Sequence, residues 1–466
     1  MKPWTFEQLR QTMLSHWVYR GDREFTGRLS IDSRQVKPGD LFIALRGRNH
    51  DGHRFIRQAV GAGAAGALVE QPLDAPTARA VAQASVTVLG CASTIAALNR
   101  LSAAYRGEIR AKVIAVGGSN GKTTTKRIID TLLAQRFRGL ASPKSFNNNI
   151  GLPLTLLSVE PEHEYVVLEV GTNAPGEVAA LGQVARPDIA VITGVDLEHV
   201  EFLGDLPAIA REEASLARFV RPGGMLIYAN HSPELNTALR LVEAARCTVS
   251  ITRGPADLQA DQISLGLEGS HFVVNGRTPY HMPLLGRPNV CNALLAIAVA
   301  RRMGLSPTQI ATGLAAVVPA PMRLQLQRWG RRWVLNDAYN ANPGSMAAAL
   351  EIFADLTFPT ADGRSVRRVA ILGDMLELGL ESEAQHRAVG RRIAGLGLSL
   401  FIAVGSAMKY AAEEAGAAGV PLRYFSDTAQ AAEAWAALLG PDDAILLKAS
   451  RAMELETLLA TRGDAS

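Results

Sequence analysis

The sequence has few cysteines, no long apolar segment and no block of like charges, and each absence excludes a class of protein. Its three cysteines, Cys91, Cys247 and Cys291, are far apart in a chain of 466 residues. This sparse, odd set fits neither a disulfide framework nor the spacing of a metal site, and it predicts a reducing compartment. The most apolar stretch, residues 59–70, is too short and too rich in glycine to span a bilayer.

A targeting signal and a strong net charge are also missing. The first residues, MKPWTFEQLRQTM, contain no apolar core of the kind found in signal peptides. The net charge of +4 is small for this length, so we expect no nucleic-acid partner. With 48% hydrophobic and 20% charged residues, the composition is that of a globular protein. We expect a cytoplasmic protein without membrane insertion, and we take it to be a monomer.

What the sequence does contain is a repeated order of apolar run, glycine or polar turn, and helical segment. The runs are continuously apolar, as strands are when helices cover both faces of a parallel sheet. A helical pattern at residues 292–304 ends at a glycine, as a C-cap would. We therefore predict a doubly wound α/β architecture. The candidate strands are residues 112–118, 165–171, 188–194, 224–230, 333–337, 367–374, 400–406 and 443–450.

The length predicts two to four domains, at roughly 100–200 residues per domain. We expect a small α/β domain at residues 1–86, which has no phosphate loop, a central domain at 87–317 and a Rossmann-like domain at 318–466. Asn275-Gly276, flanked by β-formers, predicts a hairpin that adds a small antiparallel patch to the central sheet.

The segment KVIAVGGSNGKTTTKRI, residues 112–128, is similar to a phosphate-binding loop with one glycine missing. The pattern G-x-x-x-x-G-K-[ST] would place a glycine where Val116 stands. The loop nevertheless follows a predicted strand and opens a helix, whose N-terminus adds partial positive charge. The alternative is a glycine-rich turn with an incidental lysine. The N–H groups that could converge on phosphate belong to Gly118, Ser119, Asn120 and Gly121.

Three residues after this loop complete the expected nucleotide site. Lys122 would reach the β- and γ-phosphates of ATP, and the hydroxyl of Thr123 suits Mg²⁺, with Thr124 beside them.

The short loop G-S-N-G-K-T-T resembles that of the Mur ligase family, and further stretches of similar sequence follow in order through nearly the whole chain. DAYNANP and LGDMLELG are the most specific, and they resemble the MurF branch, which joins D-Ala-D-Ala to UDP-MurNAc-tripeptide. The similar stretches are residues 31–56, 146–157, 168–178, 335–350, 371–379 and 446–456.

The resemblance implies an ATP-dependent amide ligase of peptidoglycan precursor synthesis. In this family the substrate carboxylate attacks the γ-phosphate to give an acyl phosphate, and an amine then displaces phosphate. Both steps gather negative charge, so positioning and cations supply most of the catalysis. ATP bound between the central and C-terminal domains implies domain closure.

The resemblance also implies two Mg²⁺ ions. Thr123 and Glu169 would hold the ion that bridges the β- and γ-phosphates, and His199 would help to hold a second. Together with Lys122, Glu169 and His199 would be catalytic, at the carboxyl edge of the sheet. Taken alone, a glutamate at a strand end is usually a solvated charge and a single histidine is usually structural.

Glu213 stands where the family usually has a lysine that becomes carbamylated beside the second metal. No shift of register restores that lysine, because the chain has none between Lys144 and Lys409. One hypothesis is that Glu213 supplies the carboxylate directly, without CO₂, as a catalytic metal ligand. The alternative is that Glu213 is a surface residue of its helix and the carboxylate is simply lost.

Other nucleotide contacts are implied by the same resemblance. Asn292 would contact adenine, while Asn289 could instead be the N-cap of its helix. Arg323, Asp337 and Tyr339 would contact the ribose and phosphates from the C-terminal domain.

The implied substrate-binding residues lie in two parts of the chain. The UDP-sugar would be bound by Ser33, Arg34, Asp51 and His53, although the segment that contains Asp51 and His53 could be only a turn. The remaining substrate would meet Asn148, Asn149, Asn340 and Asn342 in the cleft. Lys448, Ser450 and Arg451 could bind phosphate or a carboxylate, or form a plain turn from strand to helix.

Two other functions stay open on the sequence alone. One is a related enzyme, either a sister Mur ligase or a folylpolyglutamate synthetase, which a screen of amine acceptors would identify. The other is a regulator that binds ATP without catalysis, an alternative that the missing family lysine favours.

Overall fold

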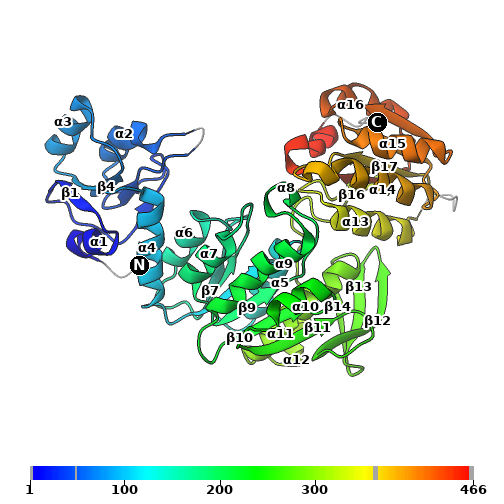
Figure 1. Ribbon diagram of the computed structural model, residues 1–466, viewed down its shortest axis with the longest axis horizontal. Coiled ribbons are helices and arrows are strands. Elements are labelled where there is room, and N and C mark those ends of the chain that lie inside the picture. The colour runs from blue at the N-terminus through cyan, green and yellow to red at the C-terminus, as the bar shows by residue number, and fades with distance from the viewer. Residues whose placement is uncertain (1–3, 48–49, 360–365, 461–466) are drawn as a thin grey trace.

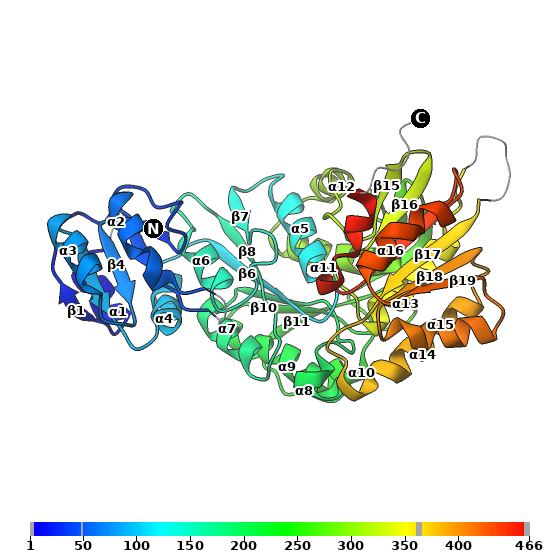
Figure 2. The same ribbon diagram turned by 90° about the horizontal axis from the view of Figure 1, so that it is seen from above.

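The computed structural model describes residues 4–47, 50–359 and 366–460, which form three α/β domains. The N-terminal and C-terminal domains lie at opposite ends of the molecule, with the central domain between them (Figure 1). Figure 2 shows the same order along the long axis after a quarter turn. The predicted α/β class with three domains is confirmed.

The N-terminal domain contains a five-stranded sheet in the order β1-β5-β4-β3-β2. Strands β2 to β5 are parallel, and β1 runs antiparallel to β5. The strands are β1 (His16–Tyr19), β2 (Leu29–Ser30), β3 (Leu41–Ile43), β4 (Gly66–Val69) and β5 (Thr87–Gly90). The helices are α1 (Phe6–Thr12), η1 (Gly52–Phe55), α2 (Ile56–Gly61), α3 (Ala75–Gln83) and α4 (Thr94–Arg106). Because β5 belongs to this sheet, the first domain boundary that we propose moves from residue 86 to beyond residue 90.

The central domain is built on a nine-stranded sheet in the order β14-β13-β12-β11-β10-β9-β6-β8-β7. Its pairs from β7 to β12 are parallel, and β12, β13 and β14 form the antiparallel patch that the sequence predicts. Asn275 and Gly276 turn the β13–β14 hairpin with φ of 51° and 63°. The strands are β6 (Lys112–Gly117), β7 (Gly139–Ala141), β8 (Tyr165–Glu169), β9 (Ile189–Ile192), β10 (Met225–Ala229), β11 (Ala245–Ser250), β12 (Leu258–Gly266), β13 (Gly269–Val274) and β14 (Thr278–Met282).

Helices cover both faces of this sheet, which explains why its central strands are continuously apolar. One core cluster runs from the N-terminal domain through α4 to one face of the sheet, and a second fills the other face beneath α5 and α11. The helices are α5 (Lys122–Leu133), α6 (Gly151–Leu157), α7 (Glu177–Ala185), α8 (Val200–Leu203), α9 (Leu206–Ala214), η2 (Ser215–Phe219), α10 (Pro233–Leu239), α11 (Arg287–Arg302) and α12 (Pro307–Ala315).

The helix predicted at residues 292–304 is α11, which begins five residues earlier than expected. Pro288 lies in its first turn, where the missing N–H costs nothing. Gly304 follows the helix with φ of 85°, as the predicted glycine C-cap requires.

The C-terminal domain has a six-stranded sheet in the order β15-β16-β20-β17-β18-β19, parallel except for the β15–β16 pair. Core clusters lie on both of its faces. The strands are β15 (Gln325–Trp329), β16 (Arg332–Asn336), β17 (Arg368–Gly373), β18 (Leu400–Val404), β19 (Leu422–Phe425) and β20 (Ala444–Lys448). The helices are α13 (Pro343–Asp355), η3 (Gly379–Glu381), α14 (Ser382–Ala394), α15 (Met408–Ala417), α16 (Thr428–Ala434), η4 (Trp435–Leu438), η5 (Arg451–Met453) and η6 (Leu455–Ala460).

None of the helices within the described residues is long and apolar enough to cross a membrane. Each of the eight strands proposed from the sequence overlaps a strand of the structure.

Candidate active site

A cavity of about 910 Å³ opens between the central and C-terminal domains. This volume lies within the range of small-molecule sites, which is about 300–1,000 Å³. Residues from the carboxyl ends of β6, β8 and β9 line it on one side, and residues that follow β16 line it on the other. Ligands of open α/β sheets bind at this edge.

The phosphate loop connects β6 to α5 at the floor of the cavity. Its glycines are required: a Cβ at Gly118 (φ 112°) would lie 2.3 Å from Thr193 Oγ1, and one at Gly121 (φ 85°) would lie 2.4 Å from Asn292 Oδ1. Val116, where the usual pattern has glycine, is buried inside β6 and paired with Glu169. The loop is therefore shorter than the usual one, because the chain turns only after Gly117.

Only part of the loop backbone is free to bind an anion. The N–H of Gly118 donates to Glu213 Oε2 at 2.6 Å, and that of Ser119 donates to the Gly194 carbonyl at 2.9 Å. The prediction that four loop N–H groups converge on phosphate is wrong for these two. Those of Asn120 and Gly121 have no acceptor within the described chain, and both residues line the cavity.

Lys122 is the first residue of α5 and curls back over the loop. Its Nζ donates to the carbonyls of Gly118 at 2.5 Å and Ser119 at 3.0 Å. Burial alone would lower the pKa of Lys122, but nearby carboxylates, Glu198 first among them, outweigh it and raise the pKa. The lysine is therefore held as a cation where phosphate oxygens would lie.

Glu169 ends β8 beneath the start of α5. Its Oε1 accepts from Thr123 Oγ1 at 3.1 Å and from Asn147 Nδ2 at 3.2 Å, and its Oε2 lies 2.9 Å from Lys126 Nζ. The structure thus brings Thr123 and Glu169 together, as the sequence predicts. Lys126 and Asn147 were not predicted, although Lys126 stands one helical turn after Lys122 in the loop motif.

Glu213 lies on α9, behind the phosphate loop, and is fully buried. The alternative that it is a surface residue is therefore wrong. Burial raises its pKa, against the opposing effect of Lys122. One oxygen holds Gly118, and the other, Oε1, has no hydrogen-bond partner in the described structure. Glu213 is not among the described residues that line the cavity.

Glu198 is a cavity-lining carboxylate that sequence reasoning missed. Its Oε1 lies 3.7 Å from Lys122 Nζ and has no hydrogen-bond partner within the residues described. Burial raises the pKa of Glu198 to about 8, although Lys122 opposes that shift. The only sequence signal was its position beside His199, since a single acidic residue after a strand predicts little.

His199 also lines the cavity, and its imidazole Nδ1 lies 2.5 Å from Glu377 Oε2 of the C-terminal domain. Glu377 belongs to the LGDMLELG segment, and the family resemblance of that segment implies no role for this residue. No group of three or more histidine, cysteine, aspartate or glutamate side chains that could hold a metal occurs in the described ranges.

Residues of the C-terminal domain reach across the cavity to the loop. Arg323 Nη2 donates to Thr123 Oγ1 at 3.2 Å, and its guanidinium lies 4.0 Å from the centre of the Tyr339 ring. Tyr339 Oη is 2.7 Å from Ser145 Oγ. These predicted nucleotide residues therefore lie beside the phosphate loop.

A second link joins the loop to the start of α13. The amides of Asn342 and Asn120 exchange hydrogen bonds of 3.0 and 3.2 Å. Asn120 also donates to Asp196 Oδ2 at 2.9 Å, and a Cβ on Gly344 would lie 1.5 Å from that oxygen. Asn342 is in addition the N-cap of α13. Asn342 also lines the cavity, and its contact with substrate stays a prediction.

Lys448 is buried and anchors the turn that follows β16. Its Nζ donates to Asp337 Oδ2 at 2.5 Å and to the carbonyl of Asn340 at 2.9 Å. Asp337, Asn340 and Lys448 all line the cavity. Ser450 bonds within its own domain, and Arg451 pairs with Glu456 away from the cavity, which favours the turn alternative for these two.

The cavity lining includes Asn148, Asn149, Asn289 and Asn292, and two of these, Asn148 and Asn289, also bond to backbone groups. Asn292 lines the cavity and donates to Asn289 Oδ1 at 3.1 Å. Asn289 is not an N-cap, because Gly286 precedes the helix and Asn289 donates to the Leu285 carbonyl inside its first turn. Asn148 and Asn149 line the cavity, and Asn148 Oδ1 also accepts from the backbone at the start of α6.

The predicted UDP-sugar residues lie apart from this cavity, at the carboxyl ends of β2 and β3. Ser33 Oγ donates to Gln58 Oε1 at 2.8 Å, and the exposed Arg34 pairs with Asp32. His53 Nδ1 lies 2.6 Å from Asp51 Oδ1, and this bond lowers the pKa of Asp51. Asp51 is also the N-cap of η1, as the alternative of a turn suggests.

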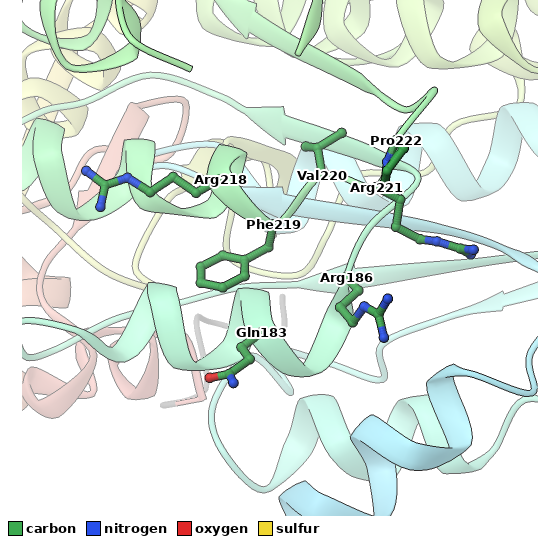
Figure 3. A pocket seen from close by; sticks show the side chains of 7 residues that line it. All are labelled: Gln183, Arg186, Arg218, Phe219, Val220, Arg221 and Pro222. Atoms are coloured by element: carbon green, nitrogen blue, oxygen red, sulfur yellow. The ribbon is translucent and has the colours of Figure 1, made fainter. Parts of the chain in front are cut away.

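A smaller cavity of about 370 Å³ lies below η2 and contains three arginines. Figure 3 shows that Arg218 points to the other side of Phe219 from Arg186 and Arg221. The three guanidinium groups therefore do not converge on a shared anion position, and we assign no site to this cavity.

Comparison with known proteins matches all three domains to the models of one family. The matches are the catalytic domain of the Mur ligase family at residues 27–106, the Mur ligase middle domain at 116–300 and the Mur ligase glutamate ligase domain at 322–451.

Similar proteins extend over almost the full chain. It is 34% identical to the UDP-N-acetylmuramoyl-tripeptide–D-alanyl-D-alanine ligase of Bacillus subtilis, with 92% of each chain covered. The crystal structure of MurF from Acinetobacter baumannii matches with a TM-score of 0.87 and 31% identity, covering 99% of this chain and 98% of that one. MurF of Thermotoga maritima in complex with ADP matches in fold, with a TM-score of 0.79 and 23% identity over 93% and 96% of the two chains.

Proposed function

The chain belongs to the Mur ligase family, and we propose that it is the ligase that joins D-alanyl-D-alanine to UDP-N-acetylmuramoyl-tripeptide with consumption of ATP. The observation that carries this function is a phosphate loop in a cavity shared by the central and C-terminal domains, in a chain 34% identical to such a ligase. The cavity has room for a nucleotide and for the reacting end of a peptide.

The residues present fit ATP. The N–H groups of Asn120 and Gly121, which have no acceptor in the described chain, and the Lys122 cation form a cradle for phosphates. Asn292 and Tyr339 would bind the remainder of the nucleotide, beside Arg323 and Asp337.

The residues also fit Mg²⁺, since Thr123 and Glu169 place two hard oxygen donors side by side. A bound Mg²⁺ would neutralise charge on the transferring phosphoryl group. Lys126 holds one carboxylate oxygen of Glu169 and so fixes the direction of the other. We propose His199 for a second ion, with Glu213 as a further carboxylate whose Oε1 is still unpartnered within the described chain.

Side chains of this protein can position the substrates and stabilise charge in both steps of the ligation. The substrate carboxylate attacks the γ-phosphate of ATP and releases ADP, and the amine of D-alanyl-D-alanine then displaces inorganic phosphate from the acyl phosphate. Lys122 and Arg323 stabilise the charge that builds up, and closure of the two domains keeps water away from the acyl phosphate. Asn148, Asn149 and Asn340 line the remaining wall for the peptide.

The UDP-sugar is proposed to bind at the N-terminal domain, near Arg34 and His53. Both residues follow parallel strands of the N-terminal sheet, and ligands of such sheets bind beyond the carboxyl ends of the strands. A cytoplasmic location and a monomeric state remain our expectations for this enzyme.

The test is phosphate release by the purified protein with Mg-ATP, UDP-MurNAc-tripeptide and D-alanyl-D-alanine, each omitted in turn. Release that needs all three supports the ligase. Release with a different amine would identify a sister enzyme, and ATP binding without release under any mixture would refute the ligase.

A second arm tests Glu213, with bicarbonate removed and then restored. Glu213→Gln keeps an acceptor for the Gly118 N–H but removes the charge, whereas Glu213→Ala removes both. If Glu213 is a metal ligand, the glutamine variant loses activity and the parent ignores bicarbonate. Full activity of Glu213→Gln would leave Glu213 only the role of holding the loop.

A further inference from the structure

One contact between the central and C-terminal domains involves Glu377, a residue to which no function has been assigned so far. His199 is the N-cap of α8, and its Nδ1 meets Glu377 Oε2 at 2.5 Å. Because an ionised carboxylate only accepts, the imidazole Nδ1 donates this hydrogen bond. The N–H of Glu201 donates to the Glu377 carbonyl at 3.2 Å. In Figure 1, α8 lies against the C-terminal domain, so this short helix bridges the two bodies.

Both partners of the contact have a strained backbone. His199 has φ of 50° and Glu377 has φ of 62°, in the left-handed region that is unfavourable for a residue other than glycine. Such strain persists only where the surroundings over-determine it, and it is typical of functional sites. A chance ion pair on the surface would not need a strained backbone at both residues.

The loop that carries this glutamate is held rigidly in the C-terminal domain. Asp374 accepts from the first N–H groups of α15 and so caps that helix. The N–H of Met375 donates to His386 Nε2 at 3.0 Å, and that of Leu376 donates to Ser450 Oγ at 2.9 Å. The carboxylate is therefore presented from a fixed platform.

The contact also determines which ring nitrogen of His199 is left available for another partner. Nδ1 is used by Glu377, and Nε2 has no hydrogen-bond partner in the part of the chain that the structure describes. His199 lines the cavity, whereas Glu377 does not appear among its described lining residues. A carboxylate behind an imidazole fixes the tautomer and the ring orientation of the histidine.

We propose that Glu377 is a positioning residue that orients His199, so that docking of the C-terminal domain and alignment of this histidine are one event. The proposal deepens the ligase function proposed above and rests on it. The simpler alternative is a surface ion pair of little energetic consequence, because the Glu377 side chain is 48% exposed.

Glu377→Ala and Glu377→Gln test this role against matched substitutions of Glu381. Glu381 lies on η3, four residues further along, is exposed and has no side-chain partner within the described residues. Loss of a carboxylate behind a functional histidine costs about 10- to 100-fold in activity. We expect kcat of Glu377→Ala to fall by that factor with KM for ATP little changed. Glu377→Gln should lose less, because its amide oxygen still accepts.

A readout independent of activity is the ¹⁵N NMR signature of the His199 ring. The chain has nine histidines, and the signal of His199 is identified by its loss in His199→Gln. The parent and Glu381→Ala should show a proton on Nδ1 of His199, and Glu377→Ala should lose that preference. Thermal unfolding of each variant excludes a general loss of structure.

The outcomes are distinct. A fall in kcat together with the tautomer change supports the proposal. A fall in kcat without that change, the change without the fall, or equal effects of the Glu377 and Glu381 variants would each overturn it. If Glu377→Ala does not fold, Glu377→Gln decides by the same two measurements. A parent without ligase activity refutes the proposed function instead, while the NMR comparison still tests the contact.

Discussion

The N-terminal and C-terminal domains each present polar residues in the loops that flank their sheets, but these residues bond differently. In the N-terminal domain, Arg34 pairs with its neighbour Asp32, and His53 pairs with Asp51. In the C-terminal domain, Arg323 bonds to the phosphate loop and Glu377 bonds to His199, both in the central domain.

The difference indicates how each site is formed. The C-terminal residues complete a cavity whose other half is the central domain, so their function depends on the position of the domain. The N-terminal residues form a local surface, and among the described residues before α5 and its loop only Asn99 lines the cavity. Substitutions of the N-terminal residues and of the C-terminal residues should therefore affect different substrates.

The largest effect should come from Arg323→Ala. Loss of one preorganised donor to a developing charge costs about 10²–10³-fold in kcat. We expect a loss of this size, with weaker nucleotide binding, measured by phosphate release and by titration with ATP. Arg328→Ala is the matched control, since Arg328 also stacks on an aromatic ring, that of Trp333, but lies outside the described cavity lining. Similar losses in both variants would mean that stacking, rather than contact with the site, is what matters.

Arg34→Ala should have a smaller and more selective effect. A hydrogen bond to a charged group is worth about 1.5 kcal/mol or more, so KM for the UDP-substrate should rise about tenfold. KM for ATP and for D-alanyl-D-alanine should stay the same, as measured by initial rates with each substrate varied. Arg79→Ala, on the exposed side of α3, serves as the control. A change in KM for ATP would contradict the separation of the N-terminal surface from the cavity.

Much of the fold could be predicted because its signals are local. Continuous apolar runs gave the strands, and Asn275-Gly276 gave the hairpin. The pairing of Thr123 with Glu169 also followed, since both residues stand at strand or loop ends that a parallel sheet brings to one edge.

Contacts between domains could not be predicted in the same way. Nothing in the local pattern pairs Asn120 with Asn342 or His199 with Glu377, because these bonds depend on how two separately folded bodies dock. The burial of Glu213 could not be predicted either, because its helix carries neighbouring charged residues. Only the packing of α9 behind the phosphate loop makes it a fully buried carboxylate. Hence the sequence located the site better than it assigned individual roles.

The smallest predicted effect is on the pH dependence of the free energy of unfolding. It concerns His386, which holds the loop that carries Glu377. Burial lowers the pKa of His386 below 6.5, although its bond to the Ser382 carbonyl and the nearby Asp374 oppose this shift. The unfolded chain then binds more protons below pH 6.5 than the folded chain, so the free energy of unfolding falls as the pH falls through that value. One such group gives a slope of at most about 1.4 kcal/mol per pH unit.

His386→Gln should flatten this slope, because it removes the titrating group. The measurement is urea-induced unfolding between pH 5 and 8, followed by tryptophan fluorescence, to which Trp329, Trp333 and Trp435 of the C-terminal domain contribute. Protonation of His386 places a proton on Nε2 and so removes the acceptor of the Met375 N–H. An unchanged slope would mean that losing this bond costs the folded state little, and the platform beneath Glu377 would then be less rigid than its hydrogen bonds imply.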